Sequence, residues 1–133
     1  FMSIKYNDLV ENFSLLSEPI DKFSYLIDLG KESRGVPQKF KTDQNLVKGC
    51  SSLAWVVCKK KENNQYEIFT DSDAFIVKGL LVLLENTVSG MNKNEIEQLE
   101  AKNILRDFGL SDSITSQRLN GLGSAIQRIK ESL

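Results

Sequence analysis

Histidine is absent from this chain, and cysteine occurs only twice, as Cys50 and Cys58. Without histidine, neither thiol can belong to a Cys–His catalytic dyad. The cysteines are not spaced as CxxC and no histidine can complete a ligand set, so we expect no metal site. Two cysteines are also too few for the disulfide scaffold of a small secreted domain. These absences favour a protein of a reducing compartment.

Long apolar runs and a strong charge of one sign are missing too. The longest apolar run, residues 80–84, is far too short to span a bilayer. The first residues lack the apolar core of a secretion signal, and Phe1, which precedes the first methionine, is expected to be a cloning remnant. The net charge of −1 gives no affinity for nucleic acid or an anionic membrane. We therefore expect a cytoplasmic bacterial protein, or a plastid protein if the source is a plant.

The length and composition fit one globular domain. The chain has 133 residues, of which 41% are hydrophobic and 26% charged, enough apolar material for one core. No internal repeat, low-complexity stretch or linker divides it. We expect a single domain over residues 1–133.

The hydrophobic pattern predicts two helices, a small antiparallel sheet and then three or four further helices. Expected helices cover residues 7–16, 19–31, 74–88, 93–108 (as one or two helices) and 113–133, and expected strands cover 44–49, 53–59 and 66–70. This order predicts an α+β fold, with a sheet of about three strands packed against helices on one face. The helix at 74–88 is apolar around most of its circumference, so we expect it in the middle of the fold.

Several element boundaries have their own signals. Gly30 is expected to stop the second helix, and Asp71, Ser72 and Asp73 supply N-cap chemistry for the helix at 74–88. Lys78 interrupts that apolar helix and is expected to snorkel towards water. The basic run at 59–61 is followed by Glu62 and two asparagines, which predicts a solvated hairpin turn and not a binding patch.

Cys50 lies where a loop runs into the expected strand at 53–59. Gly49 precedes it and can adopt positive φ, so the backbone can turn sharply just before the sulfur. Cys58 alternates with apolar residues within the strand, and we interpret it as a core residue. If Cys50 does chemistry, we expect it to act as a thiolate that meets another sulfur.

The residues around Cys50 and three other stretches resemble the SufE family of sulfur-acceptor proteins, which includes the CsdE-type paralogues. The matching stretches are 49–57 (GCSSLAWVV), 71–80 (DSDAFIVKGL), 116–122 (SQRLNGL) and, more weakly, 25–30 (YLIDLG). The second is the most specific of the four. Ser51 departs from the glutamine that commonly follows the cysteine in the family, whereas Ser52 keeps the family's serine.

The resemblance implies a fold like that of the IscU-type iron–sulfur scaffold proteins, and a role. Family members take sulfur from the persulfide of a SufS-type cysteine desulfurase, raise its turnover and hand the sulfur to an iron–sulfur scaffold complex. By this resemblance Cys50 is the catalytic residue, and Gly49, Ser51, Asp73 and Arg118 are candidates for loop or partner contacts. The chain itself would bind no cofactor, because the pyridoxal phosphate belongs to the desulfurase.

Persulfide transfer suits a chain without histidine. An ordinary thiol is ionised to a few per cent at neutral pH, so thiol exchange needs no general base. A mobile loop over residues 47–52 would bury the sulfur at rest and expose it on the desulfurase, with Leu53, Trp55 and Phe75 as candidate walls of the resting pocket.

Other readings of the sequence stay open. The chain is expected to act as a partner and activator of a desulfurase and not as a stand-alone enzyme. The alternatives are a CsdE-type carrier for another thio-cofactor or an RNA-modification pathway, a small-molecule thiol enzyme, and an interaction module in which Cys50 is structural.

Overall fold

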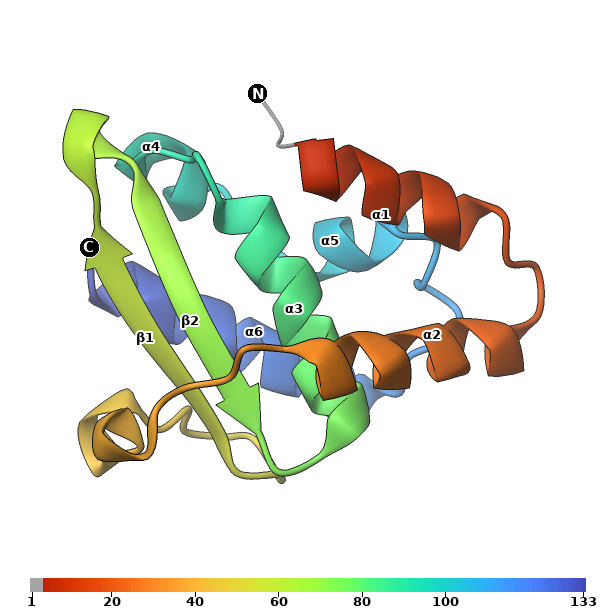
Figure 1. Ribbon diagram of the computed structural model, residues 1–133, viewed down its shortest axis with the longest axis horizontal. Coiled ribbons are helices and arrows are strands. Elements are labelled where there is room, and N and C mark those ends of the chain that lie inside the picture. Colours follow the sequence, from red (N-terminus) through yellow and green to blue (C-terminus); the bar gives the residue numbers. More distant parts are fainter. Residues whose placement is uncertain (1–3) are drawn as a thin grey trace.

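The structure, a computed structural model, describes residues 4–133 and has the expected α+β architecture (Figure 1). Its helices are α1 (Ile4–Ser14), α2 (Pro19–Glu32), α3 (Phe75–Val88), α4 (Lys93–Glu97), α5 (Ala101–Asp107) and α6 (Ser116–Glu131). Its strands are β1 (Ala54–Lys60) and β2 (Tyr66–Ser72), and short 3-10 turns occur at Gln38–Phe40, Asp43–Asn45 and Glu62–Asn64. The helices α3 and α6 lie on one side of the hairpin, so the prediction of helices on one face of a small sheet is confirmed.

The sheet is an antiparallel pair whose register runs from Ala54 opposite Ser72 to Lys60 opposite Tyr66. Asn63 and Asn64 both adopt positive φ in the connecting turn, a conformation that asparagine tolerates better than most residues, so the hairpin prediction is confirmed.

A full third strand at 44–49 does not form. A 3-10 turn occupies Asp43–Asn45 and Gly49 turns at a φ of 85°. Only one antiparallel bridge, between Leu46 and Trp55, is left to extend the sheet beyond β1.

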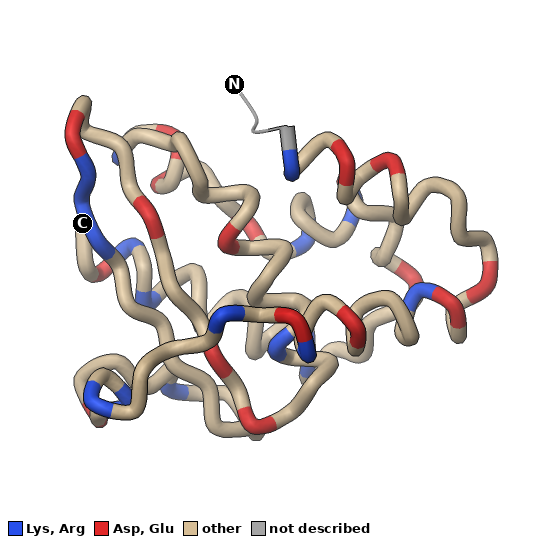
Figure 2. The backbone as a smooth tube through the Cα atoms, in the orientation of Figure 1, with Lys and Arg blue, Asp and Glu red and all other residues tan. Residues whose placement is uncertain are grey.

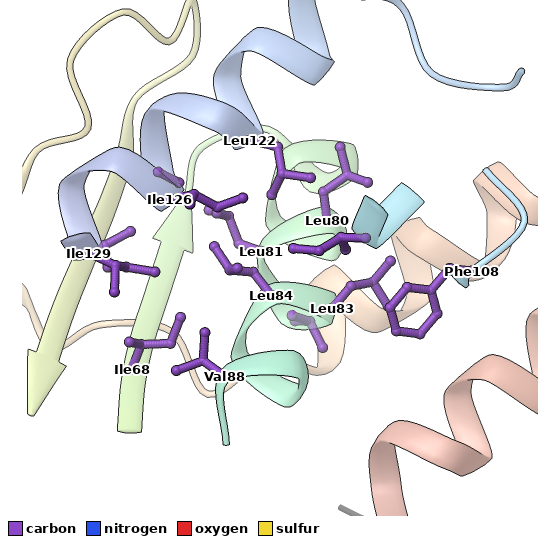
Figure 3. Close-up of a cluster of buried hydrophobic side chains, with 14 of the residues drawn as sticks. Ile68, Leu80, Leu81, Leu83, Leu84, Val88, Phe108, Leu122, Ile126 and Ile129 are labelled. Atoms are coloured by element: carbon purple, nitrogen blue, oxygen red, sulfur yellow. The ribbon is translucent and has the colours of Figure 1, made fainter. Parts of the chain in front are cut away.

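Helix α3 is the centre of the hydrophobic core. It packs against α2, β2, α6, α1 and α5, and its residues 79–84 are all buried. Figure 3 shows Leu81 and Leu84 of α3 beside Ile126 of α6 and near Ile68 of β2. The expectation of a central helix at 74–88 is therefore confirmed. Among residues 4–133, no helix is both long and apolar enough to cross a membrane.

Two glycines allow α2 and α3 to cross with their backbones in contact. A Cβ on Gly79 would overlap the carbonyl oxygen of Leu26, and a Cβ on Gly30 would lie 2.5 Å from the carbonyl oxygen of Phe75. The prediction that Gly30 stops the second helix is wrong, because α2 continues to Glu32 with Gly30 buried inside it. The close crossing, and not the helix end, requires glycine here.

Replacing Gly79 by alanine is expected to destabilise the fold by about 1–3 kcal/mol, because the added methyl group meets backbone that cannot move aside. Urea denaturation measures the loss. The matched control is Gly123→Ala on α6, where an added Cβ meets nothing within 4 Å; it should stabilise by about 0.5–1 kcal/mol through helix propensity. Equal stability changes in the two variants would contradict the crossing argument.

A segment that we call the strap (residues 33–47) connects α2 to the sheet and crosses the sheet face opposite the helices (Figure 1). Its cations cover aromatic rings of that face. The Arg34 guanidinium lies 3.8 Å from the ring centre of Phe69, and the Lys41 ammonium lies 5.0 Å from that of Trp55. The helices and the strap thus lie on opposite faces of the sheet.

Asp71 holds the strap to the sheet from a buried position at the end of β2. Its carboxylate accepts hydrogen bonds from the backbone N–H groups of Val36 (3.0 Å) and Ser72 (2.9 Å). It also pairs with the ammonium groups of Lys41 and Lys78, each at 3.2 Å. Asp71 therefore does not cap α3, and Lys78 turns inward to this carboxylate where snorkelling was expected.

The pKa of Asp71 is set by opposing effects. Burial, the largest, raises it, but the hydrogen bonds from Val36, Lys41, Ser72 and Lys78 together hold the pKa below its usual value. A folded-state pKa below the unfolded value means that the ionised carboxylate stabilises the fold above about pH 4, and that this stabilisation is lost as the pH falls further.

The variant Asp71→Asn is expected to lose about 2 kcal/mol of stability at pH 7, because the partly buried ammonium groups of Lys41 and Lys78 lose their counter-charge. The difference from wild type should shrink as the pH is lowered below about 4. Urea denaturation between pH 7 and pH 3 tests both statements, with the exposed Asp112→Asn as control. A difference that stays constant over that range would show that the charge of Asp71 is not responsible.

The surface charges are mixed in sign along the chain (Figure 2). The lysines at 59 and 60 end β1 and are exposed, as are Lys61 and the adjoining turn Glu62–Asn64. This arrangement matches the solvated hairpin turn expected from the sequence.

Candidate functional site

The Cys50 loop, which we define as residues 48–52, is fixed at both ends and free between them. At its entry, the Val47 N–H donates to the carbonyl oxygen of Ala54 (2.8 Å). At its exit, the Leu53 N–H donates to Asp73 Oδ1 (3.1 Å). The turn at 48–49 aside, no hydrogen bond within residues 4–133 holds the loop. The loop can therefore move while the residues on either side stay in place.

A second set of hydrogen bonds, to the carbonyl group of Leu53, also holds the exit of the loop. The carbonyl oxygen of Leu53 accepts hydrogen bonds from Ser72 Oγ (2.8 Å) and from the Asp73 N–H (3.1 Å). Ser72 Oγ also accepts from the Ala74 N–H (3.2 Å) just before α3. The predicted N-cap role of residues 71–73 is wrong, because no side chain caps α3, whose N-cap residue is Ala74. Ser72 and Asp73 instead hold Leu53 at the exit of the loop.

Cys50 lies half-buried against α6. A Cβ on Gly121 would lie 3.2 Å from the Cys50 sulfur, so the thiol rests directly on the helix backbone. Beside it is a cavity of about 20 Å³, room for about one water-sized atom. Its remaining walls are mostly apolar side chains of β1, α3 and α6: Ala54, Val77, Leu80, Leu81, Leu122 and Ala125.

The predicted walls of this pocket were wrong. Leu53 and Phe75 are 51% and 50% exposed, and Trp55 points to the strap side of the sheet, where Lys41 covers it. The turn at Gly49 places Cys50 against α6, so Ala54 lines the cavity and its neighbours Leu53 and Trp55 do not.

The structure brings Arg118 and Ser51 to the same place as Cys50. Both residues line the small cavity and also an adjoining surface hollow of about 560 Å³. Lys31 and Phe75 lie on the other side of that hollow. Arg118 comes from the first turn of α6, whose N-cap is Thr115.

Gly49 sits against α6, where its Cβ would lie 3.1 Å from Ser124 Oγ, and its positive φ of 85° confirms the conformation expected for it. Lys48 faces a different hollow beside Ser124 and Arg128.

Cys58 belongs to a different part of the fold. It is half-buried in β1, packed against the core, and burial raises the pKa of its thiol although Arg128 opposes the shift. Among residues 4–133 no group of three or more His, Cys, Asp or Glu side chains could hold a metal ion. The site that remains is a single thiol on a loop, against an apolar pocket.

Sequence reasoning missed the partners of the loop on other elements. Gly121 lies in the stretch 116–122 that the resemblance singled out, but nothing in the sequence places it beside the Cys50 sulfur. Ser72 was expected only as part of the N-cap segment 71–73, and not as a partner of Leu53. Ser124 carries no sequence signal, because its importance depends on the position of Gly49 against α6.

A family model described as the Fe–S metabolism associated domain, SufE, matches residues 7–133. This chain belongs to the SufE family. It is therefore a SufE-like protein of iron–sulfur metabolism, as the four motifs indicated.

Relatives of known sequence match almost the whole SufE-like chain. An uncharacterized SufE-like protein of Rhizobium meliloti is 35% identical over 127 residues, which are 93% of this chain and 91% of that protein. Another, from Rhizobium etli, is 35% identical over 128 residues, 94% of this chain and 86% of that protein. The cysteine desulfuration protein SufE of Wigglesworthia glossinidia brevipalpis is 29% identical over 129 residues, 97% of this chain and 90% of that protein.

A solved structure has the same fold. The solution structure of a hypothetical protein from Thermus thermophilus superposes with a TM-score of 0.73 over 98% of this chain and 94% of that one. At 20% identity the likeness shows the fold alone.

Removing the carboxylate of Asp73 is expected to loosen the exit of the Cys50 loop. In Asp73→Ala the Leu53 N–H loses its acceptor, so its amide should exchange faster and Cys50 should be alkylated a few times faster. Global stability should fall by only about 1 kcal/mol, because the bond is exposed. Hydrogen exchange and thiol alkylation measure these effects. Asp73→Asn keeps the Oδ1 acceptor and serves as the control; loosening in both variants, or in neither, would contradict this role.

Proposed function

We propose that this SufE-family chain carries sulfur as a persulfide on Cys50, taking it from a cysteine desulfurase and delivering it to iron–sulfur cluster assembly. The observation that carries the proposal is the position of the Cys50 sulfur. It lies beside an apolar pocket, on a loop that is clamped at both ends and that no other hydrogen bond within residues 4–133 holds beyond its turn at 48–49. Family membership supports the desulfurase as the partner.

The chemistry requires only an accessible sulfur. The Cys50 thiolate attacks the outer sulfur of the partner's persulfide; a new S–S bond forms on Cys50, the partner's S–S bond breaks, and the partner's cysteine leaves as a thiolate. No electrons are gained or lost overall, and no metal or bound cofactor of this chain takes part. The pyridoxal phosphate that first generates the persulfide belongs to the desulfurase.

The surface around the loop suits a protein partner. Leu53 and Phe75, each about half exposed, flank the loop, and Lys31 and Arg118 edge the adjoining hollow. Exposed apolar side chains next to cations are typical of interfaces between proteins. We infer that a SufS-type desulfurase docks here and draws the loop outward, with Gly49 as the turning point and with Ser51 and Arg118 in contact with the partner.

A small-molecule thiol enzyme is the weaker candidate because no resolving thiol is near Cys50. Cys58 lies four residues beyond Ala54 along β1, about 13 Å at the rise of a strand. Cys50 rests at Gly121 of α6, whereas Arg128, whose charge influences Cys58, lies seven residues further along that helix, about 10 Å away. A disulfide needs Cα atoms within about 7 Å, so the two could pair only if β1 came apart.

Intact-protein mass spectrometry after incubation with a SufS-type desulfurase and cysteine tests the proposal. A mass increase of one sulfur is expected on wild type and on Cys58→Ser but not on Cys50→Ser. Cys50→Ser should still bind the desulfurase, because the docking surface remains intact.

Two outcomes would overturn the carrier proposal. If Cys50→Ser gained the mass of one sulfur and Cys58→Ser did not, the carrier would be Cys58 and not Cys50. No increment on any variant, with desulfurase turnover confirmed and binding detected, would leave an interaction module without the transfer chemistry.

A further inference from the structure

One face of α6 contacts both the end of the strap and the Cys50 loop, through residues spaced one helical turn apart. Arg128 donates from Nε (3.0 Å) and Nη2 (2.6 Å) to the carbonyl oxygen of Gln44. One turn nearer the N-terminus Ser124 faces Gly49, and a further turn along Gly121 faces Cys50. Residues 121, 124 and 128 follow the spacing of one helix face. The position of the Cys50 sulfur is therefore set relative to α6. The strap is anchored at Arg128, and the sulfur lies about two turns away, at the small residue Gly121.

At Gly121 there is little room for a side chain between α6 and Cys50. A Cβ there would lie 3.2 Å from the Cys50 sulfur and 4.0 Å from the Cys50 Cβ. The first distance is shorter than an ordinary van der Waals contact, so something would have to shift. Helix α6 cannot shift readily, because Leu122, Ala125 and Ile126 are buried in the core beside this contact. The loop can, because within residues 4–133 no hydrogen bond holds it beyond its turn.

We propose that Gly121 is a positioning residue that sets the resting place of Cys50: the missing side chain lets the sulfur lie on the helix backbone at the mouth of the apolar cavity. A side chain at 121 displaces the sulfur outward and increases the share of time in which it is exposed. This inference rests on the proposed function for its meaning, since the resting place is where a carried sulfur would be shielded. It adds a determinant on α6, remote in sequence from the loop.

The test is the alkylation rate of Cys50 in Gly121→Ala, with iodoacetamide at neutral pH and peptide mapping of both cysteines. The thiolate attacks the methylene carbon, a C–S bond forms, the C–I bond breaks and iodide leaves. We expect Cys50 of Gly121→Ala to react roughly three- to tenfold faster than in wild type, the effect of a small overpacking that a loop can relieve. The rate at Cys58 should not change, because its surroundings are untouched.

Gly123→Ala is the matched control. It makes the same glycine-to-alanine change on the same helix, two residues away, at a position where the added Cβ meets nothing within 4 Å. It should leave the Cys50 rate at the wild-type value. Equal Cys50 rates in Gly121→Ala, Gly123→Ala and wild type, with native circular dichroism, would overturn the proposal.

A double variant keeps the test decisive if Gly121→Ala perturbs the fold. Replacing Cys50 by alanine removes the sulfur that the new methyl group would meet. In the Cys50→Ala background, Gly121→Ala should raise the melting temperature as Gly123→Ala does, and in the Cys50 background it should raise it less or lower it. Failure of Cys50→Ala to restore the stability of Gly121→Ala would mean that the methyl group meets some other group, and would overturn the proposal.

These measurements use no desulfurase. A chain that fails to acquire sulfur but shows the Gly121 effect would refute the carrier function alone, and a chain that acquires sulfur without the Gly121 effect would refute only the positioning role.

Discussion

The contact between the backbones of α2 and α3 is the constraint from which the rest of the structure follows. Gly79 brings α3 against the Leu26 carbonyl, and Gly30 does the same from the opposite helix. With α2 this close, α3 can be buried along most of its length and still present Val77, Leu80 and Leu81 to α6. These three side chains line the small cavity beside Cys50. The cavity beside Cys50 thus depends on the crossing of α2 and α3 elsewhere in the core.

Hydrogen bonds fix the residues on either side of the Cys50 loop but not the loop itself. Leu53 is held through both its N–H and its carbonyl group, and behind it the Asp71 cluster fixes the strap to the end of β2. Residues that lead into and out of the loop therefore do not have to reorganise when it moves. The entropy of ordering is confined to about five residues, each of which costs roughly 1–2 kcal/mol to fix. A partner can compensate for that with a modest contact surface.

The sequence predicts well what depends on local pattern and poorly what depends on the meeting of distant segments. The uniform apolar circumference of residues 75–88 indicated a central helix, and Asn63 and Asn64 indicated the hairpin turn. Asp71 looked like a cap because its neighbours begin a helix, yet its partners Val36 and Lys41 are about thirty residues away. Gly30 looked like a stop because it lies near a helix end. Cys50 and Arg118 belong to two separate family motifs and line one cavity in the structure. The other walls of that cavity come from β1, α3 and α6, and the local sequence around Cys50 does not indicate them.

The same geometry explains how a chain with one useful thiol can avoid side reactions. Thiol exchange depends on access as well as on ionisation, and in the resting position the helix backbone at Gly121 and the apolar cavity cover one side of the Cys50 sulfur. Oxidants and small thiols must approach from the remaining side, whereas under our proposal a desulfurase that engages Leu53 and Phe75 draws the whole loop out. Selectivity then comes from the size of the surface needed to move the loop and not from recognition of the sulfur itself. A free thiol of the same intrinsic reactivity on a rigid, open turn would lack this discrimination.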